Sequence, residues 1–336
     1  MILEDVTRLS FTWQVRSVVL ATPPRRAKLP RVMKVLVTGA TGFVGRELLR
    51  RLHADGHPLR LLVRNPASPA ARRAADRFHA ELHQGDVIEG GSLAAAATGT
   101  EAVIHLVGII SEFGRSTFEN AHVRATGNML QAARDAGVRR FIHMSALGTR
   151  PGATARYHQT KWAAEELVRG SGLDWTIFRP SLIHGAGDQF VNLFADLSRW
   201  SPILPVMGSG RGRLQPVAVE VVAAAFTGAL TEPRALGRTF DVCGPEPMSL
   251  VALLDTILAV LGRRRVKLHI PLPLARAQAA LLEFVWPRLL GRAAPFNRDQ
   301  LLMLQEDNVG DPQPAAELFG LKRMPFRESI AAWLGR

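Results

Sequence analysis

The chain has 336 residues, of which 47% are hydrophobic and 21% charged, and its formal net charge is +13. This length and apolar content suffice for a large folded core, so they exclude a disordered chain and suggest two domains or one large domain with an appendage. No charge-free apolar run is long enough to span a bilayer. The single cysteine, Cys243, excludes an internal disulfide and a thiolate metal site, which favours a reducing compartment.

The positive charge raises the question of nucleic acid binding, and the residue pattern argues against it. The basic residues are mostly scattered arginines, with one dense cluster from Arg263 to Lys267. Nucleic-acid sites interleave basic residues with aromatic side chains that stack on bases, whereas this chain has one tyrosine and its phenylalanines fall in apolar segments. We therefore expect no nucleic acid partner. Anionic lipid headgroups or an acidic protein fit the charge better.

Residues 1–32 differ in composition from the rest of the chain. They hold six basic and two acidic residues, three prolines and no sustained hydrophobic period. The apolar run is too short for a secretory signal, and a transit peptide stays an alternative although the stretch is not serine-rich. We predict a disordered or dispensable extension, followed at Met33 by the first strand.

The stretch KVLVTGATGFVG, residues 34–45, combines a strand, a turn and a helix start. A glycine permits the tight turn, another lets the backbone approach a pyrophosphate, and the third lets helix and strand pack closely. Phosphates then bind the unpaired N–H groups at the helix start. The pattern predicts a dinucleotide site whose cofactor-binding residues here are Gly39, Thr41, Gly42, Phe43, Val44 and Gly45.

From Met33 to residue 180 the chain alternates strands and helices, which predicts an α/β Rossmann fold with a doubly wound parallel sheet. The later strands are expected at residues 59–63, 80–87, 102–108, 141–146 and 175–178, and the helices at 118–136 and 157–169. Ligands of such sheets bind at the carboxyl ends of the strands. The residues expected there are Arg64, Asp86, Val87, Val107, Gly108, Ser145 and Pro180.

Arg64 bears on the choice of cofactor. Many NAD sites place Asp or Glu at the end of the second strand to hold the ribose 2′-hydroxyl, whereas an arginine suits the 2′-phosphate of NADP. A guanidinium binds phosphate with two parallel hydrogen bonds. Arg64 follows LRLLV directly and no carboxylate occupies the strand end. The sequence favours NADP(H) over NAD(H), with a solvated loop arginine as the alternative.

Tyr157 and Lys161 form the second candidate constellation. Residues four apart share one face of a helix, so the phenol and the ammonium should lie together. A phenol normally titrates near 10, too high for acid–base chemistry at neutral pH. We expect the lysine, with a positively charged nicotinamide, to favour the phenolate and lower the pKa of Tyr157.

These motifs resemble the short-chain dehydrogenase/reductase superfamily. The resemblance rests on TGATGFVG, the GDV of the third strand, HLVG, MSALG, YHQTK and WTIFRPS. The stretch from Gln215 through FNRDQLLMLQEDNV is similar to the atypical branch that contains the NDUFA-nine-like subunits of respiratory complex I and their bacterial NAD(P)-binding relatives. The resemblance covers residues 33–334.

The resemblance implies residue roles. Tyr157 would be the general acid and base, Lys161 would hold the nicotinamide ribose, and a serine on the fifth strand would bind the substrate oxygen. Ser145 lies twelve residues before Tyr157, close to the spacing of the family, although a shift of one residue would place Ala146 there. His122 stands near the position of the family's helix asparagine.

The remaining histidines, among them His105, His143 and His184, have no metal-ligand spacing and are expected to be satisfied core or loop residues. Residues 33–180 are predicted to form the cofactor-binding core, and residues 181–336 a smaller mixed lobe with some segments returning to the sheet. In this lobe we expect a returning strand at 240–243 and helices at 249–261 and 274–290. The last helix either packs on its own lobe or contacts, with the cluster from Arg263 to Lys267, a membrane surface or a lipid-like substrate.

Two functions remain open from the sequence. The first is an NADPH-dependent oxidoreductase or epimerase-like enzyme that acts on a carbonyl or hydroxyl of a small-molecule or lipid-like substrate. The second is a non-catalytic NADPH-binding accessory protein of a respiratory or quinone-related complex. We expect a cytoplasmic protein, with a peripheral position at the inner membrane face as the alternative. No metal is expected.

Overall fold

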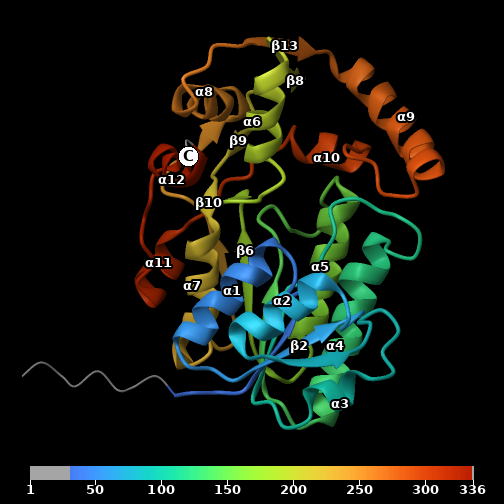
Figure 1. Cartoon of the computed structure of the whole chain (residues 1–336), viewed down its shortest axis with the longest axis vertical. Helices are drawn as coiled ribbons and strands as arrows, with labels where there is room; N and C mark the ends of the chain where they lie inside the picture. The colour runs from blue at the N-terminus through green and yellow to red at the C-terminus, as the bar shows by residue number, and fades with distance from the viewer. Residues whose placement is uncertain (1–30, 335–336) are drawn as a thin grey trace, which may run out of the picture. The chain divides into compact units, whose positions relative to one another are not determined.

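The glycine-rich turn follows an inner strand, β1, of a seven-stranded parallel sheet, whose order is β11-β6-β5-β4-β1-β2-β3 (Figure 1). The computed structural model describes residues 31–334, so the predicted extension lies outside the described residues apart from Arg31 and Val32. The sheet strands are β1 (Val35–Thr38), β2 (Leu59–Val63), β3 (Glu81–Gln84), β4 (Ala102–His105), β5 (Arg140–Met144), β6 (Asp174–Pro180) and β11 (Arg238–Val242). This arrangement confirms the α/β Rossmann prediction.

Helices cover both faces of this sheet. Those of the core are α1 (Phe43–Ala54), α2 (Pro69–Phe78), α3 (Leu93–Ala97), a π-helical turn η1 (Glu119–Arg124), α4 (Ala125–Asp135) and α5 (Arg156–Arg169). Side chains alternate along β1: Val35 and Val37 join the core under α1 and α2, whereas Leu36 joins the core under α3 and α4. This alternation explains why the strand is apolar throughout.

The chain beyond residue 180 builds a second lobe and also returns to the sheet. Its helices are α6 (Val191–Trp200), α7 (Val219–Ala229), η2 (Pro233–Ala235), α8 (Leu250–Val260), α9 (Leu272–Leu290), α10 (Arg298–Met303), α11 (Gln313–Phe319) and α12 (Phe326–Leu334). Its short strands are β7 (Ile183–His184), β8 (Ile203–Met207), β9 (Arg213–Leu214), β10 (Val217–Ala218), β12 (Met248–Ser249) and β13 (Val266–Ile270). The edge strand β11 pairs with β6, and α7 packs against α1.

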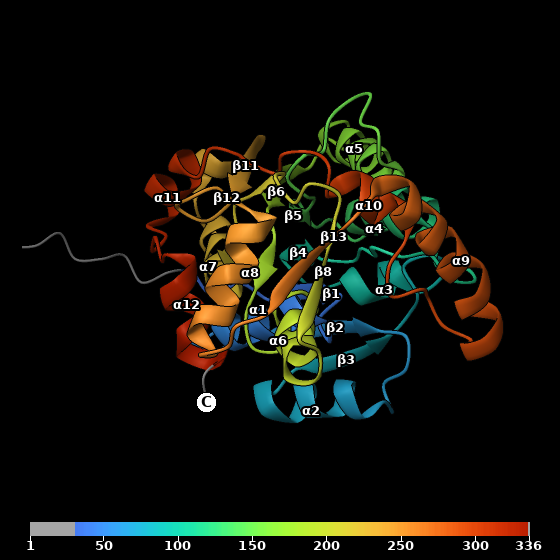
Figure 2. The same cartoon turned by 90° about the horizontal axis from the view of Figure 1, so that it is seen from above.

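A separate apolar core holds the lobe together. It is formed mainly by α6, α8 and α12, with Leu253, Ile257 and Ile330 almost fully buried. Figure 2 shows α6, β8, β13 and α9 on the side of the lobe that faces the viewer. Among residues 31–334, no helix is long and apolar enough to cross a bilayer.

Two local features differ from the sequence expectations. The fourth strand ends at His105, and the residues from Leu106 to Gly108 form a loop because they bend over the glycine-rich turn. The predicted helix at 118–136 begins with the π-helical turn η1, which no hydrophobic period predicts. Such turns are common near functional sites.

Candidate active site

Two glycines of the turn have the conformation and the close packing that their spacing predicts. Gly39 adopts a φ of 73°, the left-handed region that favours glycine. A Cβ on Gly45 would lie 2.4 Å from the Gly39 oxygen and 2.5 Å from the Ala40 oxygen, so only glycine allows α1 to pack this closely on the turn. Gly42, which precedes α1, has its own hydrogen bond from its N–H to the Gly39 oxygen, at 3.0 Å.

The start of α1 can hold an anionic group. Its N-cap residue is Gly42, which supplies no side-chain cap, and its first turn contains no acidic residue. The first N–H groups of a helix have no partner within the helix, so those of Phe43, Val44 and Gly45 are suited to the oxygens of a pyrophosphate. Thr41 is half-buried beside them. This donor set fits a dinucleotide.

The carboxyl ends of β4 and β5 bring the turn close to Lys161. A Cβ on Gly39 would be 3.3 Å from the Val107 nitrogen, and a Cβ on Gly108 would be 2.8 Å from Nζ of Lys161. Glycine at position 108 therefore leaves room for the ammonium. The structure thus joins the glycine-rich turn, the loop after β4 and α5 in one site.

The other residues predicted at this edge follow neighbouring strands. Arg64 directly follows β2 and is exposed. Asp86 follows β3, and its Oδ1 accepts a hydrogen bond from the N–H of Ile88 at 2.9 Å. Val87 is buried and its carbonyl accepts a hydrogen bond from Asn128. Pro180 ends β6, where its carbonyl accepts a hydrogen bond from the N–H of Leu147 at 2.9 Å.

Tyr157 and Lys161 both lie on the buried face of α5, with 9% and 2% of their surfaces exposed. Phe118, Ala146 and Tyr157 form one buried apolar cluster. The rings of His122 and His158 stand nearly perpendicular to the phenol ring, with centroids 5.3 and 5.2 Å away. Nζ of Lys161 donates a hydrogen bond to the Met144 carbonyl at 3.0 Å.

The pKa of Tyr157 differs from the sequence expectation. Burial raises the pKa of this phenol to about 12. Lys161 alone therefore does not produce the lowering that we expected from the lysine together with a positively charged nicotinamide. The cause of the raised pKa is burial in the apolar cluster, which desolvates the phenolate. Burial also lowers the pKa of Lys161 to about 8. Glu165 opposes this shift, although Arg169 and Arg179 already pair with that carboxylate.

Ser145 and Ala146 occupy different surroundings. The Ser145 hydroxyl is buried and donates to Oγ1 of Thr149 at 3.5 Å, and Thr149 is 3.5 Å from Nδ1 of His158. Ala146, in contrast, packs in the cluster with Tyr157. The contacts of the two side chains therefore favour Ala146 as the neighbour of the phenol, and the role of Ser145 stays a prediction.

His122 joins the loop after β4 to α5. Its Nε2 lies 3.1 Å from both the nitrogen and the oxygen of Ile109, and its Nδ1 lies 2.9 Å from Oγ1 of Thr160. Burial, followed by the positive charge of Lys161, lowers its pKa to about 2, so the ring is neutral at pH 7. The ring therefore serves as a neutral hydrogen-bonding bridge on η1.

The histidines expected to be satisfied in the core are only partly so. Nδ1 of His105 is 2.7 Å from Oγ1 of Thr38, whereas its Nε2 has no partner among residues 31–334. Within the same described range, neither ring nitrogen of His143 has a partner, nor does Nδ1 of His184. Burial is the largest cause that lowers the pKa of all three rings. These rings are neutral core residues with unsatisfied nitrogens.

The sequence did not predict the role of α10. Asp299 accepts hydrogen bonds from the backbone N–H groups of Arg156 and Tyr157, at 3.1 and 2.6 Å. Met303 packs against the cluster around Tyr157. The pattern Asn297-x-x-Gln300 is a capping signature that predicts a helix start, and both of its hydrogen bonds are present. No sequence pattern connects this helix with α5.

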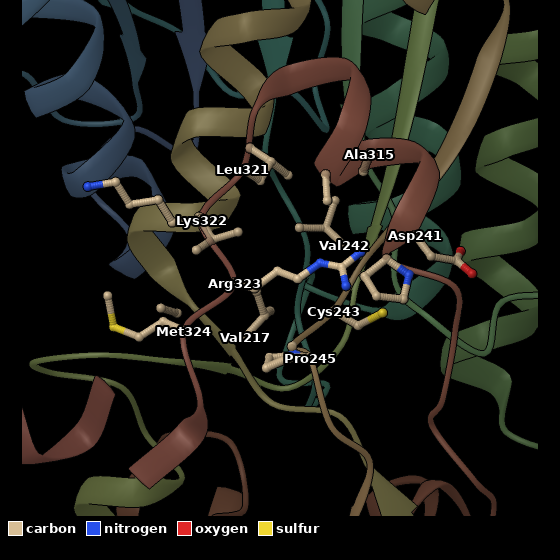
Figure 3. A pocket seen from close by; sticks show the side chains of 15 residues that line it. Val217, Asp241, Val242, Cys243, Pro245, Ala315, Leu321, Lys322, Arg323 and Met324 are labelled. Carbon is tan, nitrogen blue, oxygen red and sulfur yellow. The ribbon is translucent and has the colours of Figure 1, made fainter. Parts of the chain in front are cut away.

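Of two hollows on the protein, one is lined by residues of the predicted site and the other is not. The cavity in Figure 3 holds about 20 Å³, enough for a single water, and Arg323 extends into it near Cys243. Burial raises the pKa of the Cys243 thiol to about 12, so this thiol is unreactive at neutral pH. A larger groove of about 750 Å³ runs between α1, α2 and the start of α7, with Thr41 and Phe43 at one side.

This fold and site define an NAD(P)H-binding protein of the short-chain dehydrogenase/reductase type. Residues 39–191 match a family described as NAD(P)H-binding. A UDP-glucose 4-epimerase from Thermotoga maritima superposes with a TM-score of 0.71, at 17% identity, over 90% of this chain and 97% of that one. At that identity the likeness concerns the fold alone.

Two related proteins identify the family within this superfamily more closely. Subunit 9 of the NADH dehydrogenase (ubiquinone) 1 alpha subcomplex from Rattus norvegicus is 32% identical over 298 residues, or 86% of this chain and 76% of the relative. A ceramide reductase from Caulobacter vibrioides is 37% identical over 192 residues, or 56% of this chain and 58% of that protein. The chain belongs to the alpha subcomplex subunit 9 family within the short-chain dehydrogenase/reductase superfamily.

Proposed function

We propose that the protein is an NADPH-dependent oxidoreductase that reduces the carbonyl group of an apolar, lipid-like substrate. The observation that carries the proposal is the placement of Tyr157 and Lys161 on one buried face of α5, with Lys161 against Gly108 in the loop after β4. The apolar cluster around Tyr157 favours an apolar substrate over a sugar nucleotide. The similarity to a ceramide reductase supports the same class.

In this proposal each residue has a limited task. A bound nicotinamide cofactor supplies the hydride. Tyr157 donates the phenolic proton to the substrate oxygen and is restored from solvent. Lys161 binds the nicotinamide ribose, and its positive charge then favours the phenolate. Because burial alone raises the pKa of Tyr157 to about 12, this charge must lie close to the phenol during turnover.

The proposed preference for NADPH rests on Arg64. The side chain is exposed at the end of β2 and lies in none of the ion pairs found among residues 31–334. The next residues turn into α2, whose N-cap is Ser68. A guanidinium at this position can hold the 2′-phosphate of NADP, and no carboxylate at the strand end competes for the 2′-hydroxyl of NAD.

The second candidate is a non-catalytic NADPH-binding subunit of a larger assembly. Family membership supports it, since the mitochondrial relative is named as a subunit of NADH dehydrogenase. Two features of the site favour it as well: the Lys161 ammonium is bonded to the Met144 carbonyl, and Ala146 stands beside the phenol. Such a protein would retain its cofactor without turning it over.

The test measures NADPH consumption at 340 nm by the purified protein with long-chain 3-oxoacyl and quinone substrates. We expect turnover by the wild type and a loss of 10²–10⁴-fold in Tyr157→Phe, the usual contribution of a general acid. Lys161→Met should lose turnover and weaken cofactor binding. If the wild type binds NADPH but consumes none with any substrate, and the bound NADPH does not exchange, the accessory function replaces the enzymatic one.

A further inference from the structure

We propose that the surface formed by α6, β8, β13 and α9 docks the protein on an anionic lipid bilayer. We call this surface the lobe face. The proposal goes beyond the function proposed above and does not depend on turnover, because it rests on side chains outside the cofactor site. Figures 1 and 2 show α6, β8 and β13 side by side in the second lobe, and α9 following β13 at the edge of the same lobe.

The helix α9 is apolar on two opposite sides. Ala275 and Ala279 are fully buried against the protein. Leu274, Leu281 and Phe284 recur at helical spacing on the other side, and they are 61, 62 and 59% exposed. A helix on the surface of a soluble protein usually turns its charged side to water. An exposed apolar stripe of this kind is typical of an interaction surface.

The neighbouring elements extend this apolar surface. Val266 and Leu268 point to the same side of β13 and are 67 and 54% exposed. Val266 lies beside Ile203 of β8, in register. Trp200, at the end of α6, is 88% exposed. An indole in this position is suited to a membrane interface, where its ring meets the acyl region and its N–H meets the headgroups.

The charge of the lobe face complements an anionic bilayer. Residues 191–207 and 263–292, which form it, hold eight basic and two acidic residues. Arg263 and Arg265 bind backbone oxygens of α6, and Lys267 pairs with Asp255, so most of the cluster noted in the sequence stabilises the lobe. The exposed positive charges of the lobe face are those of Arg199, Arg264, Arg276, Arg288 and Arg292.

Arg288 shows how charge and apolar surface combine. Its guanidinium lies 3.8 Å from the centre of the Phe284 ring and donates to the Phe284 carbonyl at 2.7 Å. Long basic side chains of this kind place their stems on apolar surface and their charge at the headgroups. Amphipathic helices that lie in the membrane interface have the same composition.

A second copy of the chain fits the lobe face less well. A symmetric dimer would place this face against itself. Eight basic and two acidic residues on each side would then repel one another. An anionic bilayer accepts both the apolar side chains and the positive charge.

The test measures binding of the full chain to vesicles of phosphatidylcholine with 30 mol% phosphatidylglycerol. We expect binding that weakens at high salt and on phosphatidylcholine alone. Leu281→Ser with Phe284→Ser should weaken it at least tenfold. Arg276→Gln, Arg288→Gln and Arg292→Gln together should weaken it roughly 100-fold, since each arginine near an anionic surface contributes about fivefold.

The matched control variant removes the same number of positive charges, but from a different surface of the protein. Arg72→Gln, Arg73→Gln and Arg124→Gln remove three exposed arginines from α2 and η1, and should leave vesicle binding unchanged. All variants should keep the thermal unfolding midpoint of the wild type, because the altered side chains are exposed. Failure of the wild type to bind the anionic vesicles overturns the proposal. So does equal weakening by both arginine triples, or a dimer that dissociates in Leu281→Ser with Phe284→Ser while vesicle binding is unaffected.

Discussion

Replacing Asp299 by alanine should destabilise the protein through the helix that carries Tyr157. The carboxylate is the acceptor for two backbone N–H groups in the first turn of α5, at 3.1 and 2.6 Å. The residue at the N-cap position, Ala155, provides no side-chain cap. Asp299 therefore acts as the cap of α5 although it belongs to α10.

The expected loss in the free energy of unfolding is about 2 kcal/mol. Removal of a side-chain cap costs about 1 kcal/mol, with an upper range near 2, and a negative charge at a helix start adds roughly 0.3–1 kcal/mol. Asp299→Asn keeps one acceptor oxygen but loses the negative charge. Its loss in the free energy of unfolding should therefore be about half of the loss in Asp299→Ala. A surface pair provides the comparison: Glu89→Ala, which breaks the exposed ion pair with Arg115, should cost about 0.5 kcal/mol or less.

Urea denaturation with linear extrapolation measures these differences. The reasoning is refuted if the free energy of unfolding of Asp299→Ala lies within about 0.5 kcal/mol of that of the wild type. An equal loss in Asp299→Ala and Asp299→Asn would contradict the part of the reasoning that assigns a hydrogen-bond acceptor to this position.

Three further predictions follow from the same structure. Gly45→Ala should destabilise the protein by about 3 kcal/mol or more and abolish NADPH binding, because its Cβ would meet two backbone oxygens at 2.4 and 2.5 Å; Gly91→Ala, with open space around it, is the control in calorimetry. Arg64→Ala should raise the Kd of NADPH by about 10–100-fold and leave that of NADH unchanged in a fluorescence titration; equal effects on both would contradict the assignment. Five of the buried histidines, His105, His122, His143, His158 and His184, should make the protein acid-sensitive. Their pKa values lie below 6.5 in the folded state, so the unfolded chain binds more protons below pH 6.5 and stability falls as the pH decreases. Each should cost about 1 kcal/mol between pH 6.5 and 5.5, and a total change below 2 kcal/mol in urea denaturation would refute this.

The sheet and the glycine-rich turn could be predicted because local chemistry determines them. An apolar strand that leads directly into glycines at fixed spacing has few alternatives, and Gly39 and Gly45 have the conformation and the packing that this turn requires. Tyr157 and Lys161 were found for the same reason, since spacing alone places them on one helix face.

The rest of the site depends on contacts between distant segments. Lys161 bonds to the Met144 carbonyl, which depends on how α5 docks beside β5. The sequence could not predict the raised pKa of Tyr157 either, because its cause is an apolar cluster that includes Met303. The ambiguity between Ser145 and Ala146 arises because spacing alone does not fix which residue after β5 meets the phenol.

The capping of α5 by Asp299 also has a consequence for the order in which the protein assembles. The two partners are separated by 142 residues, so a growing chain completes α5 long before its cap is synthesised. Closing so long a loop carries an entropic cost that only the docking of the second lobe can offset. The glycine-rich turn, by contrast, is local and complete early. We therefore expect the nucleotide-binding half to form first, and the pocket around Tyr157 to close only when the last segments of the chain arrive.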